Sequence, residues 1–192
     1  MIRRISEKLA NFLLSKNVIE KSEIDIYVYG YEVLISSLVD FLIIIAIGYI
    51  FNRIIAMLLF FIMFVSVRLY TGGYHAETFL KCKIVFVFIC ISIILLSKMD
   101  LPFITVILIM LLYNAASALI TPVENINKPL NDNEKLKYRK ISIILSIIWS
   151  AISIFTYFNS IDSCQIITLT AFFITLLMVI GKYRKGGNVN ES

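Results

Sequence analysis

The residues best suited to covalent chemistry in this chain are a histidine and a cysteine seven positions apart. His75 is the only histidine among 192 residues, and Cys82 follows it in the stretch R-L-Y-T-G-G-Y-H-A-E-T-F-L-K-C, which begins at Arg68. A thiolate attacks a carbonyl carbon, and it forms when a base or a cationic group lies near the thiol. A histidine can pair with the thiolate and later protonate a leaving amine. The pair predicts nucleophilic thiol chemistry, with a hydrogen-bonded histidine of no catalytic role as the open alternative.

The residues around this pair set a geometric condition. Lysines stand on both sides of Cys82, and cationic neighbours favour a thiolate. On an ideal helix, seven residues would separate His75 and Cys82 by about 10.5 Å along the axis, which is too far for a hydrogen bond. We therefore expect the backbone between them to depart from a regular helix. Gly72 and Gly73 precede the histidine and permit the dihedral angles of a sharp turn.

The small number of possible ligands argues against a metal site, and the number of cysteines argues against a disulfide framework. Zinc needs three or four ligands, and this chain offers one histidine and few nearby thiols or carboxylates. The three cysteines are an odd number, which excludes a fully paired disulfide framework. Cys90 and Cys164 lie in apolar runs, where a thiol usually behaves as a small hydrophobic group. We expect no metal and no cofactor.

The elements that position the pair are predicted to be membrane helices. The chain is 59% hydrophobic and 16% charged, with a mean hydropathy of +0.88, which is unlike a soluble domain. Its uncharged runs approach the ~20 residues that a helix needs to cross hydrocarbon. We predict an all-α polytopic membrane protein, a single domain with about six transmembrane or re-entrant helices. The expected spans are Val33–Ile50, Ile54–Val67, Ile84–Ser97, Leu101–Ile120, Ile141–Phe158 and Cys164–Ile180.

Residues 1–30 are predicted to form a cytoplasmic amphipathic N-terminal segment. Met1–Lys21 mixes charges with apolar residues at helical spacing and lacks the apolar core of a signal peptide. Two placements stay open: the helix lies on the membrane surface, or it packs on the cytoplasmic face of the protein itself.

The distribution of basic residues predicts the orientation in the membrane. Six spans place both termini on one side. If that side is the cytoplasm, 16 of the 18 lysines and arginines are cytoplasmic, and only Arg53 and Lys98 lie outside. The catalytic segment 68–83 then faces the cytoplasm. The net charge of +5 is mostly a signal of orientation, and we expect no nucleic-acid partner.

Two further segments and one acidic residue have predicted roles. Residues 121–140 are expected to form a basic cytoplasmic loop that contacts lipid headgroups or docks an acidic peptide, and 182–192 a disordered polar tail. Asp40 lies within the first span, where it lines the active cavity, pairs with Arg68, or stands near the headgroups. The candidate substrate-binding residues are Lys128, Lys135, Lys137, Arg139 and Lys140.

The sequence resembles the AgrB family of quorum-sensing membrane endopeptidases over nearly its whole length. The resemblance is carried by G-G-Y-H-A with a cysteine seven residues after the histidine, by Arg68 before it, and by P-V-x-x-x-N-K-P-L at Pro122–Leu130. It implies a cysteine peptidase of the bacterial cell membrane that trims an AgrD-like precursor peptide, with His75 and Cys82 as the catalytic pair. It also implies an acyl-enzyme thioester that a cysteine or serine of the peptide captures, giving a thiolactone or lactone ring.

Other functions remain open at this level. A small transporter that exports a signalling peptide is the main alternative, although no internal repeat is evident. A membrane scaffold without chemistry is a third. The expected partners are the precursor peptide and membrane lipids, and the N-terminal helix and the segment Thr121–Lys140 are the candidate elements for binding the precursor. A homodimer is an open state because small helical bundles often need a partner to enclose a substrate.

Overall fold

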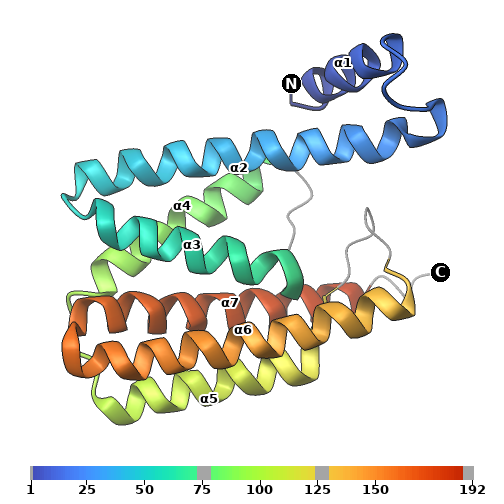
Figure 1. Cartoon of the computed structure of the whole chain (residues 1–192). Helices are drawn as coiled ribbons and strands as arrows, with labels where there is room; N and C mark the ends of the chain where they lie inside the picture. Colours follow the sequence, from blue (N-terminus) through green and yellow to red (C-terminus); the bar gives the residue numbers. More distant parts are fainter. Residues whose placement is uncertain (1, 73–78, 124–129, 188–192) are drawn as a thin grey trace. The chain divides into compact units, whose positions relative to one another are not determined.

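The computed structural model describes residues 2–72, 79–123 and 130–187. Within these ranges the chain forms seven α-helices and one short 3-10 turn, without a β-strand (Figure 1). The prediction of an all-α polytopic protein is confirmed. The elements are α1 (Ile2–Ser15), the 3-10 turn (Lys21–Glu23), α2 (Ile24–Ile50), α3 (Ile54–Thr71), α4 (Phe79–Leu96), α5 (Phe103–Ile120), α6 (Asp132–Asn159) and α7 (Ile161–Gly187).

Five of the described helices, namely α2, α3, α5, α6 and α7, are long and apolar enough to cross a membrane. The helix α4 has 18 residues, starts where the description resumes after residue 78, and is not among these five. Each of the six predicted spans overlaps one helix from α2 to α7 in chain order. The apolar runs therefore identified the helices, and the helix ends differ from the prediction.

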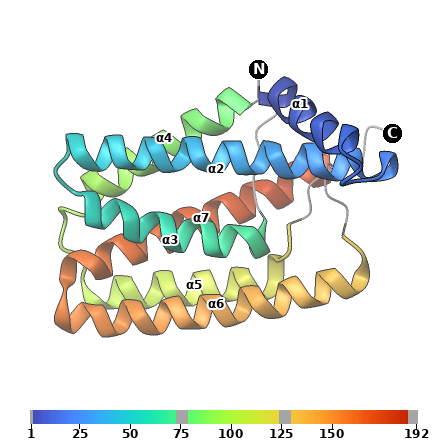
Figure 2. The same cartoon turned by 45° about the horizontal axis from the view of Figure 1, so that its top comes forward.

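The chain divides into two compact units, residues 1–43 and residues 44–192. Unit 1 contains α1 and most of α2. In unit 2, the last turns of α2 are followed by a bundle in which α7 contacts α3, α4, α5 and α6 (Figure 2). Every residue of α7 from Cys164 to Ala171 is buried, as expected for a helix that has protein on all sides. The bundle is thus organised around α7.

Small and polar side chains join α5, α6 and α7. The amide of Asn114 on α5 donates to Ser150 Oγ at 2.7 Å and accepts from Ser146 Oγ at 2.9 Å. Ser153 Oγ on α6 lies 3.0 Å from Thr168 Oγ1 on α7. Hydrogen bonds between helices, with small residues at the contact, are a common means of association in lipid. These residues therefore hold the bundle together.

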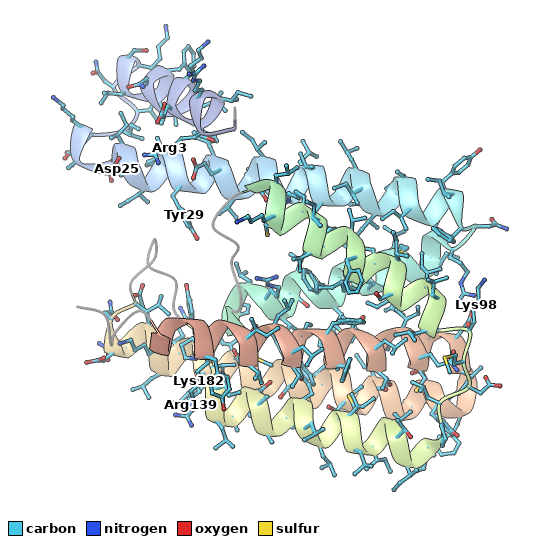
Figure 3. The ribbon with its side chains drawn as sticks, turned by 180° about the vertical axis from the view of Figure 1, so that it is seen from behind. Arg3, Asp25, Tyr29, Lys98, Arg139 and Lys182 are labelled. Carbon is cyan, nitrogen blue, oxygen red and sulfur yellow. The ribbon has the colours of Figure 1, made fainter. Side chains whose placement is uncertain are left out.

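Side-chain contacts connect the helices at one end of unit 2, which we call the Arg53 end. Arg53 Nη2 lies 3.0 Å from Asp162 Oδ1 at the start of α7. The buried amide of Gln165 donates to Met99 O at 3.0 Å and thereby holds the turn between α4 and α5. Figure 3 shows Lys98 at this same end.

The basic segment before the fifth span is helical, which corrects the expected loop. α6 begins at Asp132 and not near Ile141. The side chain of Asn131 accepts from Glu134 N at 2.8 Å, and the Glu134 carboxylate accepts from Asn131 N at 3.0 Å. This reciprocal capping satisfies backbone donors that the first turn leaves unpaired. The loop predicted over 121–140 therefore ends at residue 131, and the basic residues that follow lie on α6.

Two other helix boundaries differ from the prediction. α2 begins at Ile24, earlier than the expected start at Val33. α7 continues through Gly187, so the segment expected as a disordered tail from Lys182 begins as helix. Apolar content alone predicts where hydrocarbon is crossed, and helices extend past that boundary when their polar residues also favour helix.

Candidate active site

Cys82 lies on the first turn of α4, with its side chain partly exposed. Lys81 is exposed beside it, and Lys83 is only 7% exposed. Cationic neighbours of a cysteine favour its thiolate form, and these two lysines flank Cys82 in the chain.

The proposed base of the pair lies outside the described residues. His75 and Gly73 fall in the segment 73–78, and Lys128 falls in the segment 124–129. The pairing of His75 with Cys82 therefore stays a prediction. The described helices on either side of this segment are α3, which ends at Thr71, and α4, which is described from Phe79.

The end of α3 forms the turn that the glycines predicted. Gly72 has a φ of +67°, a conformation that favours glycine, and its N–H donates to Arg68 O at 3.1 Å. The Arg68 guanidinium carbon lies 5.2 Å from the centroid of the Phe64 ring, within the range of a cation–π contact. Arg68 and Gly72 are thus part of one compact helix terminus.

A segment far along the sequence closes over this terminus. Val123 N donates to Thr71 O at 2.8 Å, and Gly72 and Val123 form an isolated parallel bridge. A Cβ atom placed on Gly72 would lie 2.2 Å from Val123 O, which no side chain tolerates. Gly72 is therefore required for two reasons, its backbone conformation and the close approach of Val123. The bridge joins the glycine motif to the start of the P-V-x-x-x-N-K-P-L stretch, a contact that neither motif predicts alone.

The first turns of α6 complete this end of unit 2, which we call the Gly72 end. Tyr138 packs edge-on against Tyr70 of α3, with ring centroids 5.7 Å apart. The guanidinium of Arg139 donates to the carbonyl of Ala118 on α5. The Gly72 end thus comprises the last turns of α3 and α5, residues 121–123, and the first turns of α6. Figure 3 shows Arg139 and Lys182 here, at the end opposite to Lys98.

The candidate substrate-binding residues on α6 differ in their surroundings. Lys135 lies 3.7 Å from Asp132, and Arg139 contacts the end of α5 as described. Lys137 and Lys140 are exposed. The exposed pair is therefore better placed to meet an acidic partner, whereas Arg139 contributes to the packing of the helix ends.

Helix α4 takes a different course from its neighbours. It crosses α3 obliquely, so its first turn stands away from the end of α3 (Figures 1 and 2). The two helices touch through Phe86, whose ring centroid lies 5.8 Å from that of Phe60 and 5.5 Å from that of Phe64. The described residues therefore place Cys82 on α4 and Gly72 at the end of α3, two helices with different courses.

The remaining sequence-predicted residues fall into two groups. Cys90 and Cys164 are fully buried, which confirms them as core residues. Asp40 is partly exposed on α2 in unit 1. Its proposed pairing with Arg68 of unit 2 and its place at an active cavity stay predictions.

Comparison with known proteins identifies the family. The model of accessory gene regulator B (AgrB) matches residues 6–179. The chain is 28% identical over 174 residues to a Clostridium perfringens (strain 13 / Type A) protein named "Putative AgrB-like protein 2", covering 83% of this chain and 80% of that protein. It is 27% identical over 173 residues to the "Putative AgrB-like protein" of Clostridium perfringens (strain SM101 / Type A), with the same coverage. No solved structure matches.

The family match extends across both units and includes the glycine motif, Cys82, the Gly72–Val123 bridge and the basic first turns of α6. The resemblance inferred from the glycine–histidine–cysteine motif is thereby confirmed at the level of the family. The chain belongs to the accessory gene regulator B family, which takes part in peptide processing for quorum sensing.

Proposed function

We propose that this protein is a membrane cysteine endopeptidase that cleaves an AgrD-like precursor peptide and promotes its cyclisation. The observation that carries the proposal is the position of Cys82, partly exposed on the first turn of α4 between Lys81 and Lys83. A thiolate there has cationic neighbours and access to a substrate, in contrast to the two buried cysteines. The family match supports a peptide substrate.

In the proposed reaction, Cys82 Sγ attacks the scissile carbonyl and forms a carbon–sulfur bond. The carbon–nitrogen bond then breaks, and His75 transfers to the leaving amine the proton that it holds in the ion pair. A C-terminal fragment leaves, and an acyl-enzyme thioester remains. A thiol or hydroxyl within the peptide then gives its proton to the neutral His75 and attacks this thioester. The carbon–sulfur bond to Cys82 breaks, Cys82 leaves as a thiolate, and a thiolactone or lactone ring closes.

The energetics of these steps set two requirements on the site. The first step converts a stable amide into a thioester and is uphill, so turnover depends on removal of the released fragment or of the ring. The second step exchanges one thioester for another when the capturing group is a thiol, and it is nearly balanced. Water must be kept from the acyl-enzyme in the meantime, which is a reason to hold the site within a membrane bundle.

The orientation follows from the charges. We place the Gly72 end, with the first turn of α4, on the cytoplasmic side of the cell membrane, because 16 of the 18 basic residues then lie inside. The Arg53 end faces outward. A precursor that has not yet left the cell can then reach Cys82.

The Gly72–Val123 bridge has a positioning role in this proposal. The bridge fixes Gly72 at the end of α3, and the segment that contains His75 follows Gly72 in the chain. Small displacements of a reacting group reduce rates strongly, by about a hundredfold for 1 Å. We infer that the bridge limits the positions available to the base. Lys137 and Lys140, exposed on α6, are proposed to attract the acidic part of the precursor.

Separate substitutions of the two proposed catalytic residues test the function. Cys82→Ala and His75→Ala, each in the full chain in lipid vesicles, are expected to lower cleavage of a synthetic precursor by at least about a thousandfold. The matched control is Cys90→Ala, which removes a buried thiol from the same helix and is expected to retain cleavage. Mass spectrometry should detect an acyl adduct on Cys82 only when that thiol is present. Cleavage by Cys82→Ala at the parent rate would refute the proposal.

The same vesicles separate the peptidase from a transporter. The transporter alternative predicts that Cys82→Ala leaves cleavage unchanged and stops movement of peptide across the bilayer. The peptidase predicts loss of cleavage, together with normal insertion and normal protein level. Measurement of both the cleaved fragment and the peptide inside the vesicles distinguishes the two.

A further inference from the structure

The N-terminal helix α1 has one exposed apolar face and a separate buried face. Ile5, Leu9 and Phe12 recur at helical spacing and are exposed, at 42%, 39% and 57% respectively. Ser6 and Ala10, on a second face, are fully buried. Arg3 and Glu7, at the edge of the buried face, form an exposed ion pair with a nitrogen–oxygen distance of 3.1 Å. Because α1 already buries a separate face, its exposed apolar residues are not what attaches it to the rest of the chain.

Two lysines belong to the exposed apolar face. At about 100° per residue, Lys8 and Lys16 fall within the same arc of about 100° as Ile5, Leu9 and Phe12. The backbone N–H of Lys16 donates to Phe12 O at 3.2 Å, so the helical course continues to this residue. Lys16 Nζ lies 5.9 Å from the centroid of the Phe12 ring. These five residues, which we call the α1 stripe, contain no acidic side chain.

The position of α1 in the chain places the stripe near the membrane plane. α2 has 27 residues, about 40 Å at 1.5 Å per residue, and exceeds the ~30 Å of hydrocarbon. Its first turns carry Tyr27, Tyr29 and Tyr31, and tyrosine is enriched at membrane interfaces. Figure 3 shows Arg3 of α1 close to Asp25 and Tyr29 of α2. α1 therefore lies beside the part of α2 that leaves the hydrocarbon.

We propose that the α1 stripe binds an anionic lipid surface, with its apolar residues inserted below the headgroups and Lys8 and Lys16 paired with lipid phosphates. An interfacial helix of this type combines apolar burial with attraction to anionic lipid. The stripe has both features on one face, and the lysine stems are long enough to reach upward from an inserted helix. Because α2 spans the bilayer, the lipid surface is always close to α1. The inference does not depend on the proposed peptidase activity.

Tryptophan fluorescence tests the insertion directly. Phe12→Trp is made in the full chain with Trp149→Phe, so that it is the only tryptophan, and the protein is placed in phosphatidylcholine vesicles with or without phosphatidylglycerol. We expect a shift of the emission to shorter wavelength and quenching by brominated lipid, both stronger with phosphatidylglycerol. Asn11→Trp is the matched control, because Asn11 is exposed outside the stripe, and its quenching should be at most about half as strong. If Trp149→Phe lowers the protein level, Trp149 is retained and the signal of the parent is subtracted.

Charge reversal separates lipid attraction from simple apolar contact. Lys8→Glu should remove the effect of phosphatidylglycerol on residue 12, whereas Lys21→Glu, which lies outside α1, should preserve it. Equal emission in both lipid mixtures without quenching would overturn the proposal. A shift that occurs only after addition of a precursor peptide would also overturn it, and would assign the stripe to a peptide partner. The addition of Cys82→Ala should leave every one of these readings unchanged.

Discussion

The two ends of unit 2 are built in different ways. At the Arg53 end, side chains join neighbouring elements through Arg53–Asp162 and the amide of Gln165, and the connections are short. Only Ser160 separates α6 from α7. At the Gly72 end, a backbone bridge between Gly72 and Val123 joins the end of α3 to the residues that follow α5.

We infer a division between the two ends, in which the Arg53 end contributes mainly to stability and the Gly72 end mainly to function. Short connections that are fixed by side chains leave little freedom, which suits an end that only holds helices together. The Gly72 end carries Gly72, which is proposed to position the base, and Lys137 and Lys140, which are proposed to attract the precursor. Substitutions at the Gly72 end should therefore lower activity, and substitutions at the Arg53 end should lower stability.

The largest separable effect is expected at the bridge. Gly72→Ala adds a Cβ at 2.2 Å from Val123 O and strains a residue whose φ is +67°, so the end of α3 must shift. We expect a fall in kcat of about a hundredfold with little change in KM, because the base is displaced and the α6 surface is not. Precursor cleavage in vesicles measures both constants.

Gly30→Ala is the matched control for that substitution. A Cβ at Gly30 would meet nothing within 4 Å, and alanine favours helix by about 1 kcal/mol over glycine. Activity and protein level should both be retained. If Gly72→Ala keeps the parent kcat in properly inserted protein, the bridge has no positioning role and the comparison between the two ends fails at this point.

A smaller effect is expected from charge reversal on α6. Lys137→Glu and Lys140→Glu should raise KM about tenfold and leave kcat nearly unchanged, because exposed charges steer an acidic peptide and do not touch the reacting atoms. Lys98→Glu removes the same charge at the Arg53 end and should change neither constant. An equal rise in KM for Lys98→Glu would show that total charge matters and that the α6 surface has no special role.

The smallest effect is expected at the Arg53 end itself. Asp162→Asn removes the ion pair with Arg53, whose partners are partly exposed, so the loss of stability should be only about 0–1 kcal/mol. Thermal unfolding in detergent measures the loss, and kcat per folded molecule should match the parent. A large fall in kcat without loss of stability would place functional residues at this end too and would remove the proposed division.

Much of the helical architecture was predictable because each span is a long apolar run. The beginnings of helices were less predictable, since polar residues can extend a helix beyond the hydrocarbon. For α6 a usable signal was present, because Asn131 followed three residues later by Glu134 is a capping-box pattern. Cys82 could be identified as a candidate from its lysine neighbours. Its place on the first turn of α4 required the structure.

The sequence by itself determined the membrane class, the six apolar segments, and the rarity of the histidine and cysteine that make a thiol site conceivable. These properties depend on composition and on spacing between near neighbours. Only the tertiary structure decided that Val123 closes over Gly72, since this contact joins residues about fifty positions apart and has no periodic signal. It also decided which apolar face of α1 is buried and which is exposed, because a helical pattern shows that a face is apolar without showing what covers it.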